Sequence, residues 1–199
     1  MTKVTITVFA ITMFLVACRK DTKESGSDAM TQSESAWKTN TGKEKVTRPM
    51  KVVLHSSVDP SSPALTCTLP GVPFGLANSG YFLHGSATHL GAINSESSIG
   101  LDGSCNVSGT TFILTTTTGG KIVGANGDWI TYTGDDQIDL NNIIFHGGTT
   151  AAFTGLWTIT GGTGIFAGAT GSFQVTGLGD VSTPGGPTFS IIGEGTITY

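Results

Sequence analysis

The chain has little positive charge beyond its first fifty residues. Only Lys51 and Lys121 are basic among residues 51–199, whereas nine residues of this part are Asp or Glu, which gives a net charge of −7. Nucleic-acid binding depends on clustered Lys and Arg side chains that neutralise phosphates. This part of the chain is therefore not expected to bind nucleic acid.

Long hydrophobic runs are also missing, apart from one near the N-terminus. Residues 4–16 follow Lys3 and are apolar except for three threonines. Such a run is shorter than the roughly 20 residues that span a bilayer, so it indicates a secretory signal.

The end of this run, Leu15-Val16-Ala17-Cys18, resembles a bacterial lipoprotein signal, in which a small residue precedes the cysteine that becomes lipidated. The resemblance implies that residues 1–17 are a signal peptide and that Cys18 carries a lipid such as palmitate. It also implies a lipid anchor in a bacterial cell envelope, with the outer membrane as the expected location. The alternative is an ordinary signal peptide with an incidental cysteine.

Large apolar residues are scarce between Arg19 and Pro49, where Trp37 is almost the only one. Lys, Glu, Ser and Thr dominate this segment, which cannot bury enough apolar surface to offset the entropy lost on ordering. We therefore expect a disordered tether over residues 18–49 and a folded domain over residues 50–199.

Cysteine is limited to Cys18, Cys67 and Cys105. With Cys18 assigned to the anchor, the other two either form a disulfide in an oxidising compartment or remain buried free thiols. Neither has a second cysteine at zinc-site spacing, and we predict no metal site and no cofactor.

Helical patterns are nearly absent from residues 50–199, and glycine is abundant instead. Of the 29 glycines, 27 lie between Gly71 and Gly195, where they separate short runs rich in Thr, Ile, Val, Phe and Trp. Runs of this kind predict an all-β sandwich or barrel. The expected strands are 50–57, 79–84, 88–99, 105–117, 121–133, 138–145, 152–160, 172–178 and 188–199.

Two short segments have the composition of tight hairpin turns, namely residues 118–121 (TGGK) and 125–128 (ANGD). Each offers two central residues that tolerate positive φ. The second segment has an alternative interpretation, as a bend within one long strand.

Apolar residues alternate along the expected strands, which places them on one face. Phe153, Trp157 and Ile159 share a face of residues 152–160. About eight antiparallel strands hide their edges best in a closed barrel, whose interior is filled by side chains or is just wide enough for a small ligand. The expected core or cavity residues are Phe112, Trp129, Trp157 and Phe166.

The segment GGTGIFAGATG, residues 161–171, fits the spelling of a dinucleotide fingerprint at residues 162–167. Such a fingerprint needs a helix directly after the glycines, because the helix N-terminus binds the phosphates. The residues that follow are rich in Gly and Thr and form helices poorly. We therefore expect a turn between two strands, with Phe166 as a plug in the barrel.

Residues 157–172, WTITGGTGIFAGATGS, resemble a strand–turn–strand motif of the allene oxide cyclase and dirigent barrel superfamily. Residues 85–91 are similar to a segment of bacterial secreted relatives. The resemblance implies an eight-stranded antiparallel barrel of the calycin-like or dirigent-like kind, often with an apolar cavity. Plant dirigent proteins are thought to use aspartate and arginine there, and no arginine follows Arg48 here.

Allene oxide cyclases rely on a cavity glutamate, and Glu96 and Glu194 are the only glutamates of residues 50–199. They are the candidate catalytic residues. If Glu194 pointed into the barrel, burial would raise its pKa and make it an acid or base. We expect it to point outward instead.

Residues 134–142, GDDQIDLNN, are rich in oxygen ligands of the kind that calcium accepts. They lack the spacing of a calcium loop, so we predict a solvated acidic loop.

The chain is thus expected to be a lipid-anchored envelope protein. Its barrel is expected to bind a small apolar or amphipathic ligand or to act as an accessory interaction module. The alternative is an allene oxide cyclase-like or dirigent-like enzyme that acts on a small hydrophobic substrate. The oligomeric state does not follow from the sequence.

Overall fold

The structure, a computed structural model, describes residues 44–69, 72–76, 79–108 and 112–199. The predicted signal peptide, Cys18 and the tether as far as residue 43 lie outside the described residues. Within the described ranges, no helix is long and apolar enough to cross a membrane.

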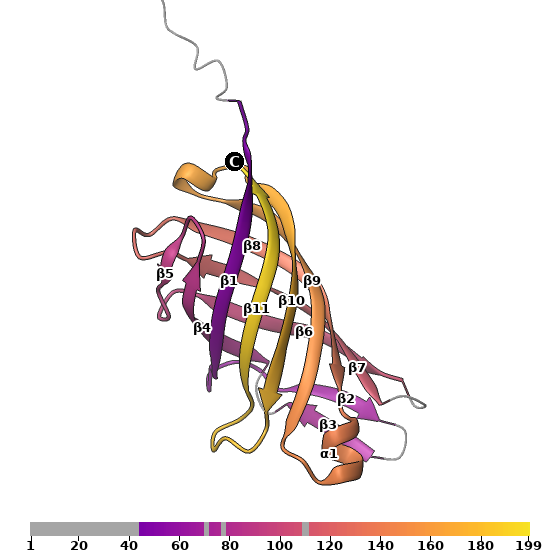
Figure 1. Ribbon diagram of the computed structural model, residues 1–199. Coiled ribbons are helices and arrows are strands. Elements are labelled where there is room, and N and C mark those ends of the chain that lie inside the picture. The colour runs from indigo at the N-terminus through magenta and orange to yellow at the C-terminus, as the bar shows by residue number, and fades with distance from the viewer. Residues whose placement is uncertain (1–43, 70–71, 77–78, 109–111) are drawn as a thin grey trace, which may run out of the picture. The chain divides into compact units, whose positions relative to one another are not determined.

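The fold is a closed antiparallel β-barrel, as predicted (Figure 1). Eight strands form the ring in the order β1-β11-β10-β9-β8-β7-β6-β4, and pairing of β4 with β1 closes it. A short strand, β5, pairs with residues 85–87 of β4, beyond the residues 80–82 that pair with β6. The strands are β1 (Thr47–Val58), β4 (Gly80–Ala87), β5 (Gly91–Ile93), β6 (Ile99–Val107), β7 (Ile113–Val123), β8 (Trp129–Asp139), β9 (Thr150–Gly162), β10 (Thr170–Asp180) and β11 (Thr188–Thr198).

Alternation along the strands fills the interior with apolar side chains. Buried and exposed residues alternate over most of β9, and Phe153, Trp157 and Ile159 face inward as predicted. Tyr132 and Phe173 are among the largest fully buried side chains.

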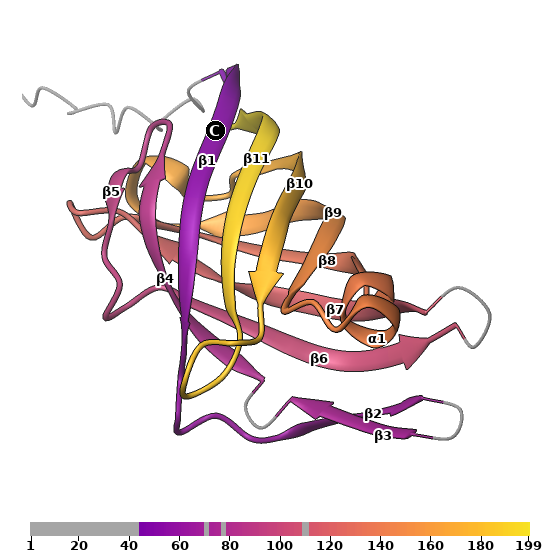
Figure 2. The same ribbon diagram turned by 60° about the horizontal axis from the view of Figure 1, so that its bottom comes forward.

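A hairpin of β2 (Leu65–Leu69) and β3 (Val72–Leu76) lies outside the ring beside β6 (Figure 2). Neither strand was predicted. A disulfide joins Cys67 of β2 to Cys105 of β6, which settles the choice between a disulfide and two free thiols. Cys67 is fully buried, so the hairpin packs against the core at this point.

Strand β6 contains a bulge that changes which side chains face inward. Asp102 pairs with Thr118 of β7, but Cys105 pairs with Thr116, so Gly103 and Ser104 stand opposite one residue. An inserted residue reverses the inward and outward positions beyond it. Asp102 and Cys105, which a regular strand would place on opposite faces, therefore both point toward the interior.

Four expected strands are wrong in extent, and local backbone geometry breaks each of them. In residues 88–99 only β5 is a separate strand, because His89 and Gly91 both adopt a φ of 72°. Residues 105–117 divide into the end of β6 and the start of β7, and Phe112 between them has a φ of 50°.

The strand expected at residues 138–145 ends after Asp139, and the chain continues as the helix α1 (Asn141–His146). The Asp139 carboxylate accepts a hydrogen bond from the Asn141 backbone N–H at 2.9 Å, which turns the chain. Gly147, with a φ of 64°, ends the helix in the left-handed conformation.

The predicted turn at residues 118–121 is also wrong, because these residues lie inside β7. The predicted turn at residues 125–128 is confirmed: it joins β7 to β8, and Gly127 has a φ of 88°. The expected strand at residues 121–133 is therefore wrong, because this turn divides it.

The segment GGTGIFAGATG connects β9 to β10 through a single 3-10 turn, η1 (Gly164–Phe166). Strand β10 follows at once, so the helix that a dinucleotide site needs is not formed. Phe166 is fully buried and contacts the Tyr199 ring edge to face, with ring centroids 4.9 Å apart. Phe166 thus plugs the barrel at the end where β1 begins, as the sequence predicts.

Replacing Gly164 by alanine is expected to destabilise the barrel. Gly164 has a φ of 56°, and an added Cβ would overlap the Asp128 carboxylate. The loss should exceed the roughly 1–2 kcal/mol that a left-handed alanine costs by itself. Chemical denaturation measures it, with Gly127→Ala as the control, because Gly127 also has a positive φ but has nothing near its missing Cβ. Equal losses in the two variants would contradict the steric argument.

Candidate functional site

A small cavity lies inside the ring, away from Phe166. Its volume is about 40 Å³ and it is partly open to solvent. Ser56, Ile138 and Phe189 lie near the ends of their strands, which places the cavity toward the end of the barrel opposite η1. The lining residues are Ser56, Tyr81, Leu83, Gly100, Asp102, Thr116, Thr118, Tyr132, Asp136, Ile138, Phe153, Trp157, Phe189 and Ile191.

Asp136 is the first of two carboxyl groups in this cavity. It lies on the inward face of β8, between Tyr132 and Ile138, and is 7 % exposed. Its pairing partner on the neighbouring strand β9 is Gly155, and a Cβ on Gly155 would overlap the Asp136 carboxylate. The indole Nε1–H of Trp157 donates a hydrogen bond to its Oδ1 at 2.9 Å. A glycine thus makes room for the carboxylate, and a tryptophan orients it.

Asp102 is the second carboxyl group and enters the cavity from β6. Its pairing partner on β7 is Thr118, whose side chain hydrogen-bonds to the Asp102 carboxyl group. Asp136 pairs with Thr116 on the other edge of β7. The two carboxyl groups therefore flank β7, two residues apart along that strand.

Burial raises the pKa of both groups. Burial, with a further contribution from the charge on Asp136, raises the pKa of Asp102 to about 7, while its hydrogen bond with Thr118 opposes the shift. Burial likewise raises the pKa of Asp136 to about 6, and the hydrogen bond from Trp157 opposes this shift. The outward-facing Asp135 raises it further. Both carboxyl groups can therefore take up or release a proton near neutral pH.

Aromatic rings form much of the cavity wall. The Tyr132 and Trp157 rings are stacked, with centroids 4.3 Å apart and planes 10° from parallel. Phe189 meets both Tyr81 and Phe153 edge to face, with centroid distances of 5.2 and 5.7 Å. The wall is thus apolar, and its polar groups are few and specific.

The Tyr81 hydroxyl is the one buried side-chain polar atom without a hydrogen-bond partner in the described part of the chain. Tyr81 is 5 % exposed and lines the cavity. Burial, and next the charge on Asp102, raises the pKa of this phenol, so it stays protonated. An unpaired buried hydroxyl is costly and points to a missing partner in the cavity.

The four predicted core or cavity residues have different locations. Trp157 lines the cavity and Phe166 lies in the core. Phe112 packs partly buried against the core, with its ring on Phe145. The interpretation of Trp129 is wrong: it is half-buried at the start of β8, outside the core cluster and the cavity lining, and the Lys121 ammonium lies 5.9 Å from its ring centroid.

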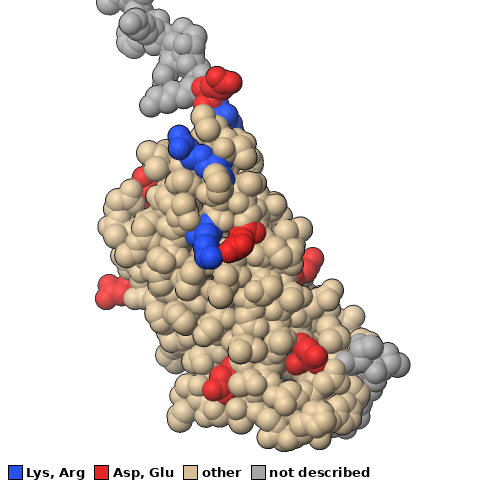
Figure 3. All heavy atoms as spheres, in the orientation of Figure 1, with Lys and Arg blue, Asp and Glu red and all other residues tan. Residues whose placement is uncertain are grey.

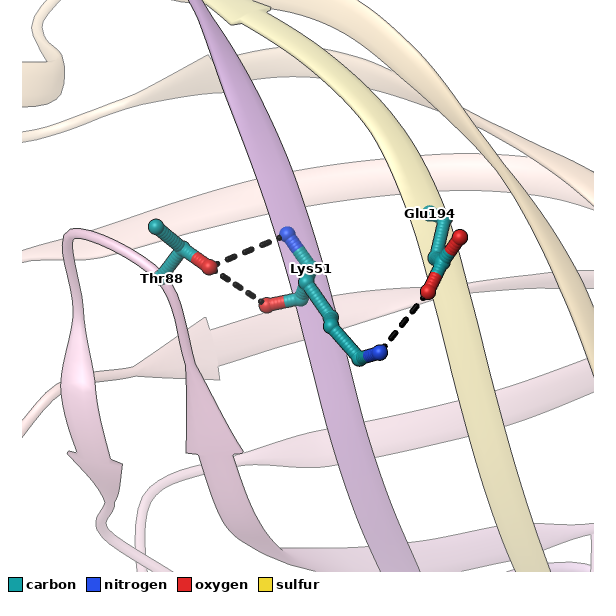
Figure 4. A network of polar contacts seen from close by, with 3 residues as sticks. All are labelled: Lys51, Thr88 and Glu194. Atoms are coloured by element: carbon teal, nitrogen blue, oxygen red, sulfur yellow. Dashed lines mark hydrogen bonds and ion pairs between the residues drawn. The ribbon is translucent and has the colours of Figure 1, made fainter.

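Neither candidate glutamate lies in the cavity. Glu194 is exposed on the outer face of β11 and forms an ion pair with Lys51 at 2.8 Å (Figure 4). The hydrogen bond and the charge of Lys51 lower the pKa of Glu194. Glu96 is exposed in the turn between β5 and β6. The predicted outward direction of Glu194 is correct, and aspartates occupy the place considered for a glutamate.

The sequence contained a signal for Asp136 that the acidic-loop interpretation missed. Ile130, Tyr132, Asp136 and Ile138 are spaced by multiples of two, which puts Asp136 on the apolar face of one strand. The segment 134–142 is therefore not a solvated loop, because residues 134–139 belong to β8. No comparable signal exists for Asp102, whose direction follows from the bulge.

Histidines come together on the outer wall in a pair that the sequence analysis did not consider. His55 and His84 face each other across β1 and β4, with ring centroids 5.6 Å apart. No group of three or more His, Cys, Asp or Glu side chains suited to a metal occurs among the described residues.

Replacing Asp136 by asparagine is expected to stabilise the protein at pH 8 and to have little effect at pH 4. A folded-state pKa raised from 3.8 to about 6 means that the folded state binds the proton more tightly. Stability is then lost as the pH rises from about 4 to 7. At roughly 1.4 kcal/mol per pKa unit, the gain at pH 8 is about 2–3 kcal/mol.

Denaturant titrations at the two pH values measure this gain. Asp135→Asn is the matched control, because Asp135 is the exposed neighbour on the same strand. A gain of the same size for both variants, or a gain at pH 4, would contradict the burial of Asp136.

The resemblance to the allene oxide cyclase and dirigent superfamily rests on residues 157–172 and, more loosely, on segments such as residues 85–91. Neither a scan against protein-family models nor searches of curated proteins and of solved structures found a match to this chain.

Proposed function

We propose that this protein is a lipid-anchored envelope protein whose barrel binds the polar head of a small amphipathic ligand. One observation carries the ligand proposal: a partly open cavity with apolar walls contains two carboxyl groups and an unpartnered phenol. Sites for small molecules commonly combine apolar walls with a few such groups.

The size of the cavity limits what enters it. The volume of about 40 Å³ suits a few water molecules or one small polar group. The rest of the interior is filled by side chains such as Phe166 and Phe173. The apolar part of the ligand would therefore remain at the open end.

A titration with 1-hexanol tests the ligand proposal. The indole N–H resonance of Trp157 should shift on binding, because this group lines the cavity, whereas that of Trp129 should not. Thr116→Leu, which fills the cavity, should abolish the shift, and Thr115→Leu, on the outer face of the same strand, should retain it. If hexanol, a longer alcohol and an alkyl amine of the same length all fail to shift the Trp157 signal, the ligand proposal fails and an accessory interaction module is favoured.

Two features support the envelope part of the proposal. A disulfide between Cys67 and Cys105 suits an oxidising compartment outside the cytoplasm. Lys45 and Arg48 lie exposed in the segment that follows the proposed anchor, and basic side chains are seen at this end of the surface in Figure 3. Basic side chains near a membrane favour an anionic lipid surface.

Labelling with a radioactive fatty acid tests the anchor. The wild-type chain should incorporate label and Cys18→Ala should not. Cys67→Ala is the control, because it removes a cysteine that lies outside the signal. Unlabelled wild-type protein would rule the anchor out.

Acid–base catalysis on a small hydrophobic substrate is the second candidate function, and the raised pKa values of Asp102 and Asp136 favour it. Near pH 7 such a pair supplies one carboxylic acid and one carboxylate. Hydrogen–deuterium exchange at the methyl groups of acetone is a general test for such a pair. Wild-type protein should accelerate it and Asp136→Asn should not. Equal rates in both would argue against this candidate.

A further inference from the structure

The cavity carries negative charge without a positive partner. Asp102 and Asp136 are its charged residues, and no Lys, Arg or His lines it. Of the basic residues in the described ranges, Lys45, Arg48 and Lys51 are exposed, and Lys121 lies over the Trp129 ring. Buried carboxylates without a paired cation are costly. The residues that line the cavity therefore provide negative charge but no cation to pair with it.

The acceptor atoms gather within one small space. Asp102, Asp136 and Tyr81 all line the same cavity of about 40 Å³. The Trp157 hydrogen bond engages Oδ1 of Asp136 and leaves the second oxygen available. The Tyr81 oxygen has no partner at all.

The surrounding rings suit a cation as well. Tyr81, Tyr132, Phe153, Trp157 and Phe189 all line the cavity. Aromatic faces attract cations, most strongly where water is excluded. A neutral or anionic head group would not gain this attraction, and an anion would be repelled by the negative charge in the cavity.

We propose that this cavity selects the primary ammonium group of a small alkyl amine. An ammonium group has three N–H donors, and the cavity offers three acceptors in Asp102, Asp136 and Tyr81. A group of this size fits a cavity of about 40 Å³. This inference rests on the proposed ligand-binding function and specifies the chemistry of its ligand.

Paired titrations of hexylamine and 1-hexanol into the full chain test the inference. The two test ligands have the same alkyl chain and differ in the charge of the head group. At pH 7.5, hexylamine should bind at least about tenfold more tightly, as judged by the Trp157 indole N–H resonance, with Trp129 as the internal reference. Hexanoate should not bind.

Substitutions test which residues cause the preference for the amine over the alcohol. Asp102→Asn and Asp136→Asn should each reduce the amine-to-alcohol affinity ratio toward one, whereas Asp135→Asn, on the outer wall, should retain it. Tyr81→Phe removes only the free oxygen and should lower the ratio about threefold, roughly the effect of one hydrogen bond. Circular dichroism of each variant confirms that it is folded.

The pH dependence distinguishes ion pairing from a merely structural role. The ionisable groups that face the cavity are Asp102, Asp136, Tyr81 and Tyr132, and Asp135 acts from the outer wall. Hexylamine stays charged between pH 8 and pH 5, whereas both cavity carboxyl groups take up protons. The amine preference should therefore decline over this range.

Two results would decide against the inference. If hexanol shifts the Trp157 signal but hexylamine binds no more tightly, the amine inference is wrong and the ligand-binding function stands. If neither compound shifts the signal, both proposals fail.

Discussion

Replacing Phe166 by alanine is expected to lower the free energy of unfolding by about 3–5 kcal/mol. Phe166 is fully buried on the turn between β9 and β10, and it plugs one end of the ring against Tyr199. The substitution removes the apolar contacts of the ring and leaves a void that strands held in register cannot collapse to fill.

Guanidinium denaturation followed by circular dichroism measures this loss. Ile165→Ala is the matched control, because the neighbouring Ile165 is 58 % exposed and should cost less than about 1 kcal/mol. A loss below about 1 kcal/mol for Phe166→Ala would mean that the ring does not fill the barrel end.

Removal of the Cys67–Cys105 disulfide is expected to cost about 4 kcal/mol. The bond closes a loop between residues 38 apart, and cross-links of this length restrict the unfolded chain by roughly that amount. It also fixes the β2–β3 hairpin to β6, so its loss should free the hairpin before the ring unfolds.

Denaturation of the wild-type protein with and without dithiothreitol measures the effect. The double variant Cys67→Ala/Cys105→Ala should be destabilised by a similar amount and should not respond to the reductant. Wild-type protein that is equally stable in both conditions would show that the two thiols are not joined.

The strands at the C-terminal end of the chain are the part of the fold that could be predicted most fully. In β9, β10 and β11 apolar and polar residues alternate, and this pattern is set by burial on one face. The breaks at His89 and Phe112 could not be predicted, because non-glycine residues rarely adopt a positive φ. The β2–β3 hairpin was missed because its stability depends on a distant partner, Cys105.

The glycines of residues 119 and 120 show why composition alone misplaced a turn. A Gly-Gly pair is typical of a tight hairpin, but here it lies within β7. A Cβ on Gly120 would come within 2.9 Å of the Tyr132 hydroxyl, and Gly100 on the neighbouring strand borders the same atom. Gly120 and Gly100 thus leave space for the large inward ring of Tyr132, and this requirement depends on which strands pair.

The candidate site shows a similar limit. Trp157 could be predicted as an interior residue from its alternating neighbours, but its partner Asp136 lay in a segment whose composition is typical of a surface loop. The inward direction of Asp102 could not be predicted, because it depends on the bulge in β6. The pairing register, not the composition, determines which carboxyl groups are buried.

The closure of the ring has a consequence for how the chain acquires its structure. Strand β1 pairs along residues 47–55 with β11, so the first strand of the barrel needs the last one. During synthesis β1 can pair only with β4 until residues 188–198 have been made. Folding through such distant pairings is slow. The unfinished chain therefore keeps one edge of β1 unpaired until the last strand has been made.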